Sequence, residues 1–557
     1  MMIKKNRIPS PVNLLLLIAL FFGTLAGVNA QGPQPQRERR VNTPTPTVTP
    51  TPKPTPVPTP DPVLSTVVIQ TPGPKTLEEL RARITEVLRS PELNAAQMAV
   101  KIVSLDSGRT LFEENAAKLL HPASNMKIYT VAAALDRLGP DFRFKTSAYV
   151  PSMPDSSGTI RGDLVIYGRG DPSFAASFNN GDYYKAIDDF AARIAASGVK
   201  RIEGNIIGDE SYFTGGRLGY GWEWDDLQWY YGAEISALTV DDNSLDLFVK
   251  PGQDVGAPGI VTTGPITPLV TIVNRTTTAP RGTKRSITVV RPLGTNTIEV
   301  SGSVPLGLDP ADKGNIGSVA ITNPALLFIY MLRSSLASKG VTLTGQSQTI
   351  DARGRIAQPL QINSLVEIAS VESPPLSFIA AQTLKPSQNL YTELLLRTLA
   401  KSVSPNGSTP ERNTADDGIE AVKTFLRQAG VEPRGQFVMA DGSGLSRHNY
   451  ITANGTLQLL TYMSTHRYAN TFRDALPIAG VDGTLRTRMR TTSAAGNLRA
   501  KTGTINGVAS LSGYVTTAGG ERLVFSIIVN NYPEESTARR VFIDNIAVLL
   551  ASFAGRS

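Results

Sequence analysis

The stretch that decides the fold is HPASNMKIYTVAAAL, residues 121–135. Its long apolar run predicts a buried helix, and that helix is expected to begin at Ser124, just after Pro122-Ala123. Ser124 and Lys127 are three residues apart, so their side chains share one face and the amine can reach the hydroxyl. Burial disfavours the charged ammonium, which makes a neutral amine available as a base. Backbone N–H groups at a helix start can also bind an oxyanion, so Ser124 is predicted to be a nucleophile.

The spacing of Ser124 and Lys127 is a weak signal by itself, because serine and lysine are common residues. Ser197-Gly198-Val199-Lys200 has the same spacing. There Gly198 indicates a helix C-terminus, where a serine has no free backbone donors beside it. Ser124 is therefore the preferred candidate, and a chance match is the alternative interpretation.

A second motif is Ser387-Gln388-Asn389, which lies between Pro386 and a predicted helix beginning at Leu390. A hydroxyl and an amide two residues apart on a short loop can both face a cleft. The alternative is an N-cap serine, which is common at such boundaries. Ser177-Phe178-Asn179 and Ser404-Pro405-Asn406 match the same pattern, so this motif too needs support from the others.

The third motif is Lys501-Thr502-Gly503-Thr504, on a predicted strand before a turn at Asn506-Gly507. Lys-Thr-Gly occurs nowhere else in the chain. An edge strand protected by a lysine would explain Lys501 without any chemistry. A glycine inside a strand, however, usually marks a close backbone approach, and a substrate lying as an added strand would require one at Gly503. The motif thus predicts a substrate-binding strand edge.

Composition narrows the chemistry further. The chain has no cysteine and only three histidines, so thiol nucleophiles, disulfides, thiolate metal sites and most histidine-based hydrolase designs are excluded. The three motifs in this order resemble the S-x-x-K, S-D-N and K-T-G signature of penicillin-binding proteins and class A β-lactamases.

The long spacing between the first two motifs makes the resemblance narrower. Ser124 and Ser387 are 263 residues apart, and the family with a large insertion there is the class C low-molecular-mass penicillin-binding proteins, peptidase family S13. These are D-alanyl-D-alanine carboxypeptidases and endopeptidases of peptidoglycan. The resemblance extends from about residue 95 to the C-terminus. Its flanking strings are His121-Pro122-Ala123-Ser124, Gly168-Arg169-Gly170-Asp171-Pro172, Asp441-Gly442-Ser443-Gly444-Leu445-Ser446-Arg447 and Gly480-Val481-Asp482-Gly483-Thr484-Leu485. Gln388 departs from it, because the superfamily often has aspartate there.

The resemblance implies a role for each motif residue. Ser124 would attack the carbonyl between two D-alanines, with Lys127 as the base. Ser387 would relay a proton to the leaving group, and Asn389 would hold the substrate amide. The remaining implied roles belong to the third motif: Lys501 and Thr502 bind the terminal carboxylate, Gly503 allows the close approach, and the N–H groups of Thr504 and Ser124 form the oxyanion hole. β-Lactams are the implied covalent inhibitors.

Trp222, Asp225 and Tyr230 match a family pattern near the site for the free amine of the stem peptide. A carboxylate facing an ammonium makes physical sense. The alternative is a core tryptophan and a solvated acid.

The N-terminal residues predict export. Basic residues, an apolar run from Leu14 to Phe22 and a small-residue end at Ala30 form the pattern of a secretory signal peptide, residues 1–30. An uncleaved membrane anchor is the alternative. Residues 31–75 hold 13 of the 39 prolines and predict a semi-rigid linker. Residues 1–75 also carry +6 of the net charge of +8, which argues against a nucleic-acid partner.

The expected fold class is α/β (α+β): a serine transpeptidase/β-lactamase-like domain split by a large β-rich insertion. Its parts are residues 76–142 and 355–557, and the insertion, residues 143–354, is expected to hold two domains. The helices are expected at 77–89, 390–401, 455–464 and 536–553, and strands at 98–105, 164–167, 286–290, 298–300 and 523–529.

The predicted function is an exported serine-type D-alanyl-D-alanine carboxypeptidase, with DD-endopeptidase as a second activity, in the periplasm or cell envelope. Peptidoglycan stem peptides are the expected partners, and no cofactor, metal, nucleic acid or integral membrane domain after signal cleavage is implied. Two alternatives remain from the residues: a β-lactamase or esterase on the same scaffold, or an inactive wall-binding protein positioned by the proline-rich segment.

Overall fold

The computed structural model describes residues 72–403, 412–431, 435–532 and 538–557. The chain divides into two compact units, Met1–Pro54 and Thr55–Ser557, and every described residue belongs to the second. The predicted signal peptide and all but the last residues of the predicted linker lie outside the described residues. Within the described part, no helix is both long and apolar enough to span a membrane.

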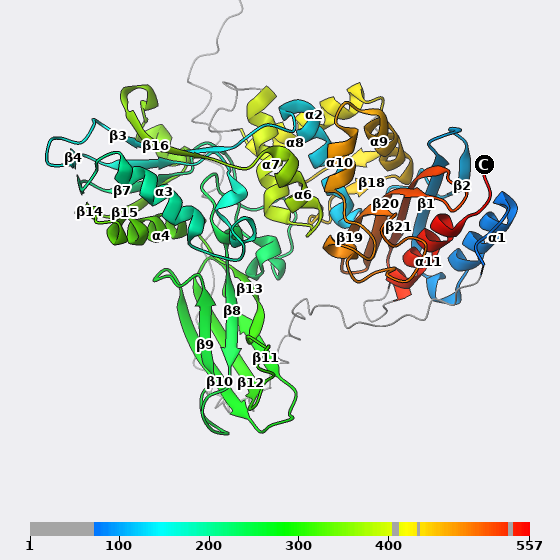
Figure 1. Cartoon of the computed structure of the whole chain (residues 1–557), viewed down its shortest axis with the longest axis horizontal. Coiled ribbons are helices and arrows are strands. Elements are labelled where there is room, and N and C mark those ends of the chain that lie inside the picture. The colour runs from blue at the N-terminus through cyan, green and yellow to red at the C-terminus, as the bar shows by residue number, and fades with distance from the viewer. Residues whose placement is uncertain (1–71, 404–411, 432–434, 533–537) are drawn as a thin grey trace, which may run out of the picture. The chain divides into compact units, whose positions relative to one another are not determined.

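A five-stranded antiparallel sheet built from both ends of the described chain carries the third motif (Figure 1). Its order is β19-β20-β21-β1-β2. The central strand β21 is buried at eight consecutive positions, as expected for a strand covered on both faces. The strands are β1 (Gln97–Ser104), β2 (Thr110–Glu114), β19 (Arg499–Ile505), β20 (Val508–Thr516) and β21 (Arg522–Asn530).

Helices cover the two faces of this sheet. Alternate residues of β21 divide between two cores: Phe525 packs with α1 and α11, whereas Val524 packs with the helices on the opposite face. This alternation follows from the two-residue period of a strand. On one face lie α1 (Leu77–Leu88) and α11 (Ala538–Ser552). On the other lie α2 (Met126–Leu138), α6 (Leu376–Leu384), α7 (Asn389–Val403), α8 (Thr414–Gln428), α9 (Ala453–Thr465) and α10 (Ala469–Ala475), beside a short pair β17 (Phe437–Val438) and β18 (Tyr450–Ile451).

Between the first and second motifs the chain forms a second five-stranded sheet, of order β15-β7-β5-β3-β16. Helices α3 (Lys185–Ala196) and α4 (Pro324–Ser338) share one hydrophobic core with it. A small sheet, β14-β6-β4, lies in the same core. The strands are β3 (Lys145–Val150), β4 (Thr159–Arg161), β5 (Leu164–Tyr167), β6 (Arg201–Glu203), β7 (Ile206–Asp209), β14 (Thr342–Leu343), β15 (Ser347–Ile350) and β16 (Val366–Glu372), with the short helix α5 (Ala352–Ala357) between the last two.

Two three-stranded sheets form a separate all-β part of the insertion (Figure 1). Their orders are β13-β8-β9 and β10-β12-β11, and they bury one common apolar cluster. Trp229, from the segment that precedes them, packs into this cluster. The strands are β8 (Ser244–Lys250), β9 (Ile260–Gly264), β10 (Thr271–Ala279), β11 (Ser286–Val290), β12 (Thr297–Pro305) and β13 (Asn315–Ala320).

The expected α/β fold class is confirmed, and the predicted elements at 77–89, 98–105 and 286–290 coincide with α1, β1 and β11 to within a residue. The sequence predicts short β-type runs separated by turns between residues 142 and 350, and it does not anticipate α3 and α4. The signal for α3 was present, because Ile187, Phe190, Ala191 and Ile194 repeat with helical spacing and are buried.

Strand β16 pairs with β3, so residues 366–372 belong to the sheet of the insertion. We therefore propose that the second part of the transpeptidase domain begins after Glu372, later than the expected residue 355.

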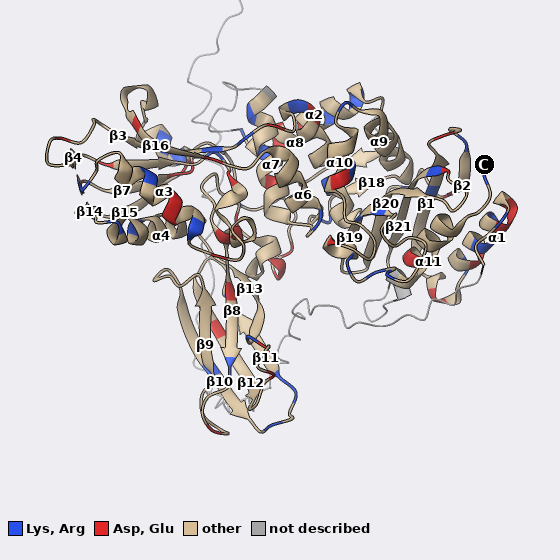
Figure 2. Ribbon diagram, in the orientation of Figure 1, with Lys and Arg blue, Asp and Glu red and all other residues tan. Residues whose placement is uncertain are grey.

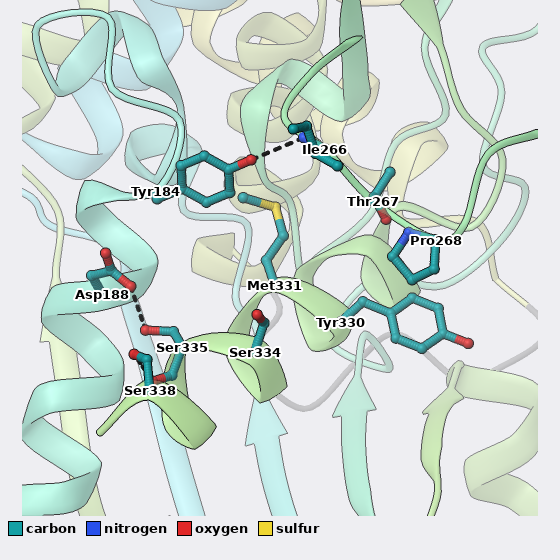
Figure 3. A pocket seen from close by; sticks show the side chains of 10 residues that line it. All are labelled: Tyr184, Asp188, Ile266, Thr267, Pro268, Tyr330, Met331, Ser334, Ser335 and Ser338. Atoms are coloured by element: carbon teal, nitrogen blue, oxygen red, sulfur yellow. Dashed lines mark hydrogen bonds between the residues drawn. The ribbon is translucent and has the colours of Figure 1, made fainter. Parts of the chain in front are cut away.

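A hollow of about 210 Å³ lies in the insertion between α3, α4 and the loop at 266–268 (Figure 3). Ser335 Oγ donates to Asp188 across the two helices, and Ile266 N–H donates to Tyr184 Oη at 2.9 Å. These bonds tie the loop and both helices together. The hollow contains none of the predicted site residues.

Candidate active site

Ser124 lies on a single 3₁₀ turn, Ala123–Asn125, that runs directly into α2. Lys127 is in the first turn of α2, and its Nζ donates to Ser124 Oγ at 2.9 Å. The structure therefore contains the contact that the three-residue spacing predicts. The turn is tight: Ala123 has a φ of +46°, a conformation that non-glycine residues adopt only when their surroundings hold them there.

The amine of Lys127 is fully buried and has three acceptors. Besides Ser124 Oγ, it donates to Asn389 Oδ1 at 2.6 Å and to the Ser443 carbonyl at 2.6 Å. Burial lowers the pKa of Lys127 to about 7, although the charges of Asp441 and Glu393 act in the opposite direction. A neutral amine beside the serine hydroxyl is thus well populated near neutral pH.

The second motif lies against both lysines. Ser387 has a φ of +67°, and its Oγ accepts a hydrogen bond from Lys501 Nζ at 2.8 Å. Asn389, at the start of α7, accepts from Lys127 and donates through Nδ2 to the Tyr231 carbonyl at 2.8 Å. The structure thus brings Ser124, Lys127 and Asn389 into one hydrogen-bonded group, and it joins Ser387 to Lys501 beside that group.

Lys501 is fully buried on β19, and its Nζ also donates to the Thr502 carbonyl at 2.8 Å. Burial lowers the pKa of Lys501 well below its usual value, and the nearby Lys127 lowers it further. Two lysines therefore share the site, each bonded to one serine hydroxyl.

Strand β19 is the outermost strand of its sheet. The Ala500 N–H donates to the Pro477 carbonyl, on the side away from β20. Alternate N–H groups of an antiparallel strand point the same way, so those of Thr502 and Thr504 face this outer side too. Thr502 Oγ1 donates to Thr484 Oγ1 at 2.7 Å, and Thr504 is exposed. This edge can accept a further strand by hydrogen bonding.

Gly503 allows a close approach, but the atoms that come close to it belong to other segments of the protein. A Cβ at this position would lie 2.2 Å from Ser510 Oγ and 2.6 Å from the Pro122 carbonyl. Around it, Asn125 Nδ2 donates to the Lys501 carbonyl and Ser510 Oγ donates to the Pro122 carbonyl. Gly503 therefore lets the nucleophile turn pack on β19, a reason that differs from the substrate approach expected from the sequence.

A loop at residues 441–446 supports the site; it is one of the strings that carry the family resemblance, but no role for it is predicted from the sequence. Asp441 accepts hydrogen bonds from the N–H groups of Gly444 at 2.7 Å and Ser446 at 2.8 Å. The Ser443 N–H donates to Glu393 at 2.8 Å, and the Ser443 carbonyl accepts from Lys127. Asp441 thus fixes an acceptor of the lysine. The resemblance to the family marked this string in the sequence, but not the contacts that its residues make.

Glu393 is a further buried group that sequence reasoning passed over, one turn along α7 from Asn389. Burial raises the pKa of Glu393 to about 7, and the charge of Asp441 raises it further. Its carboxylate therefore titrates in the same range as Lys127.

The three insertion residues singled out from the sequence differ in their contacts. Trp222 Nε1 donates to Asp441 Oδ2 at 2.8 Å, which joins it to the loop behind Lys127. Tyr230 is 37% exposed and lies edge-on to Tyr231, whose carbonyl holds Asn389. Asp225 directly precedes the short 3₁₀ turn Asp226–Gln228, makes no capping hydrogen bond with its side chain, and is partly exposed. Trp222 therefore reaches the site through Asp441, and Tyr230 reaches it through Tyr231. Asp225 lies between them in the chain.

Acidic and basic residues are interspersed over the visible elements (Figure 2). Among the described residues, no group of three His, Cys, Asp or Glu side chains is arranged to hold a metal ion.

The chain is similar to proteins of known family and fold. The model of the D-Ala-D-Ala carboxypeptidase 3 (S13) family matches residues 80–553. A D-alanyl-D-alanine carboxypeptidase from Actinomadura sp. (strain R39) is 36% identical over 491 residues, 86% of each chain. The solved structure of penicillin binding protein 4 from Haemophilus influenzae shares the fold, with a TM-score of 0.68 at 24% identity over 83% of this chain and 97% of that one. The same protein has been solved in complex with a β-lactam.

A match over most of the chain, together with a relative at this identity, assigns the molecule: it belongs to the D-Ala-D-Ala carboxypeptidase 3 (S13) family and is a serine-type carboxypeptidase.

Proposed function

We propose that this enzyme is exported and hydrolyses the D-alanyl-D-alanine end of peptidoglycan stem peptides through an acyl-enzyme on Ser124. The observation that carries the proposal is the 2.9 Å contact between Ser124 Oγ and the buried Lys127 amine, whose pKa of about 7 leaves it able to accept a proton. A general base in hydrogen-bond contact with its nucleophile contributes about 10²–10⁴-fold in rate.

In the acylation step, Ser124 Oγ forms a bond to the carbonyl carbon of the penultimate D-alanine while its proton passes to Lys127 Nζ. The carbonyl oxygen becomes an oxyanion. The Thr504 N–H on the open edge of β19 and the Ser124 N–H on its 3₁₀ turn are the proposed donors. Such donors stabilise charge that develops only in the transition state.

Collapse of the tetrahedral intermediate breaks the C–N bond, and the leaving nitrogen needs a proton. Ser387, bonded to Lys501 at 2.8 Å, is proposed to deliver it. Water then attacks the ester carbon and gives a proton to Ser387, Ser124 Oγ leaves with the proton that Lys127 had taken up, and the shortened peptide is released. If the leaving amine belongs to a cross-linked neighbouring stem, the same steps give endopeptidase activity.

Substrate placement is assigned to the edge of β19. Lys501 and Thr502 are proposed to bind the terminal carboxylate, because a buried lysine and a threonine hydroxyl at a strand edge suit that anion. Asn389 would hold the peptide amide. On the insertion side, Asp225 is proposed to face the free amine of the stem peptide, with Trp222 and Tyr230 shaping the approach.

The organisation proposed for the whole chain is a signal peptide at 1–30, a proline-rich linker at 31–75, and a transpeptidase domain interrupted by a two-domain insertion. β-Lactams are proposed to acylate Ser124, since their ring resembles the D-Ala-D-Ala end.

Labelling purified protein with fluorescent penicillin and mapping the labelled peptide tests the proposal. One label at Ser124, absent from a folded Ser124→Ala variant, is the expected result, together with release of D-alanine from a pentapeptide. A label at Ser387 or Ser197 would overturn the mechanism. Steady nitrocefin turnover would favour a β-lactamase instead, and a folded protein that neither labels nor hydrolyses would favour the wall-binding alternative.

A further inference from the structure

The insertion makes direct polar contact with the Ser387-Gln388-Asn389 segment. One contact is the Tyr231 carbonyl, which accepts from Asn389 Nδ2 at 2.8 Å. Another is Asp242, whose Oδ1 accepts from the hydroxyl of Tyr391 at 2.5 Å. Tyr391 is buried in the first turn of α7, two residues after Asn389. Residues far away in the chain therefore contact both the motif and the helix turn that follows it.

The side chain of Gln388 lies near enough to Asp242 to lower the pKa of that carboxyl, as a hydrogen-bond donor does. Gln388 is buried, and its own Oε1 already accepts from the Leu390 N–H at 3.1 Å. The amide group that remains for Asp242 is therefore the NH₂ end. Burial raises the pKa of Asp242 to about 6, against the effects of Tyr391 and Gln388, so the carboxylate is ionised at neutral pH and can accept from both side chains.

The backbone that presents Asp242 is unusual. Asp241, Asp242 and Asn243 all have positive φ, +44°, +57° and +54°. Such a conformation in successive non-glycine residues persists only where the surroundings over-determine it. Here they do: Asp241 Oδ1 accepts from the Ala176 N–H at 3.0 Å, and Asn243 Nδ2 donates to the Glu234 carbonyl at 2.7 Å. The turn is thus clamped on both sides of the carboxylate.

The donor and the acceptor of each hydrogen bond around Tyr391 can be assigned. Tyr391 Oη lies 3.0 Å from Ser177 Oγ and donates its own proton to Asp242, so the serine is left to act as the donor to the tyrosine. Ser177 therefore belongs to a row of hydrogen bonds that continues through Tyr391 to Asp242. Its Ser-x-Asn string serves this hydrogen-bonded row and does not form a second motif.

We propose that Asp242 is a positioning residue for the acylation reaction: by accepting from Gln388 and Tyr391, it holds the Ser387–Asn389 segment where Ser387 meets Lys501 and Asn389 meets Lys127. Ser387 needs such support because its own φ is +67°. The inference rests on the proposed function, and it makes the insertion a working part of the active site.

A reversal of polarity tests this inference. Asp242→Asn puts an NH₂ group opposite the NH₂ of Gln388, and Gln388→Glu puts a carboxylate opposite Asp242. The double variant Asp242→Asn/Gln388→Glu restores one donor and one acceptor, and it leaves acceptors for Tyr391 and the Leu390 N–H. Each single variant is expected to slow acylation by fluorescent penicillin roughly 10-fold or more, as for a lost charge-assisted hydrogen bond. The double variant is expected to recover most of the wild-type rate.

A second, matched pair covers the case in which a single variant fails to fold. Tyr391→Phe and Tyr183→Phe each remove a tyrosine hydroxyl that donates to an aspartate, Asp242 and Asp246 respectively, at the same 2.5 Å distance. Only Tyr391→Phe is expected to slow acylation, with both melting temperatures measured alongside.

Two results would overturn the inference: single variants that are acylated at the wild-type rate, or a folded double variant no faster than the slower single. Equal effects of Tyr391→Phe and Tyr183→Phe would also overturn it, since that pattern means general stabilisation of the insertion. A wild-type protein that is not acylated at all would instead refute the proposed function, so the two failures are distinguishable.

Discussion

Lys127 and Lys501 are both fully buried, and each donates to the hydroxyl of a different serine, Ser124 at 2.9 Å and Ser387 at 2.8 Å. The charge of Lys127 lowers the pKa of Lys501, so a state in which both amines are charged is electrostatically unfavourable. Two serine–lysine pairs of this kind can take up a proton at one side of a scissile bond and supply one at the other, without any histidine.

The acylation rate is predicted to rise with pH through about 7. Lys127 must be neutral to accept the proton of Ser124, and its pKa is lowered to about 7 by burial. Below that value the rate should fall about tenfold per pH unit, as the neutral fraction does. The measurement is the second-order rate constant for fluorescent penicillin between pH 5 and 9.

Glu393 titrates in the same range, so Glu393→Gln is the control. The pH limb should persist in this variant. Its disappearance would assign the titration to Glu393, and a flat profile in the wild type would remove Lys127 as the base.

Lys501→Ala is predicted to discriminate between substrates. Losing the partner of a carboxylate in this buried setting should cost roughly 2–4 kcal/mol of transition-state binding, about 30- to 1,000-fold in kcat/KM. A thioester without the terminal carboxylate keeps only the loss that comes from the Ser387 contact, so its kcat/KM should fall much less. Equal losses for both substrates would show that Lys501 serves Ser387 and the fold, not the carboxylate.

Gly503→Ala is predicted to lower both stability and acylation. The new Cβ would press on Ser510 Oγ and on the Pro122 carbonyl, which cannot both move away. Overpacking of this kind costs about 1–3 kcal/mol of unfolding free energy. Chemical denaturation checks this value. Gly216→Ala is the matched control, because a Cβ there meets only the Leu218 carbonyl, at 3.8 Å. If both variants behave alike, the close approach at Gly503 has no special cost.

Asp225→Asn is predicted to raise KM for stem peptides with a free amine and to leave amine-blocked peptides unchanged. Asp225 is partly exposed, and exposed ion pairs contribute only about 0–1 kcal/mol, so an increase of about two- to fivefold is expected. Glu223→Gln removes a neighbouring carboxylate that pairs with Arg447 and is the control. An equal rise in KM for blocked and free peptides would contradict a specific role for Asp225.

The three motifs could be predicted from the sequence because each is short and its residue types carry the chemistry. The spacing of Ser124 and Lys127 fixes a distance along one helix, whatever the rest of the chain does. The helix at 390–401 and the strands at the C-terminus were predictable for the same reason, since their patterns are local.

Other parts of the site depend on pairings between distant segments. Asp441 acts by holding a loop in place, and Tyr231 acts through its backbone carbonyl. Neither role leaves a residue pattern that can be recognised in the sequence. Gly503 was noticed, but its partner Pro122 lies on another element and could not be inferred from the strand. The same holds for Asp242, whose position opposite Gln388 follows only from how the insertion packs on α7.

The pairing of β1 with β21 has a consequence for how the enzyme is made. Gln97 pairs with Asn530 and Ser104 with Leu523, so the sheet joins nearly the whole length of the chain. During synthesis β1 leaves the ribosome long before β21 exists, and contacts this remote in sequence form slowly. The insertion, by contrast, contains all the strands of its own sheets, from β3 to β16. A chain cut short anywhere between α2 and β19 therefore contains Ser124 and Lys127 but lacks the strand edge that would bind a substrate.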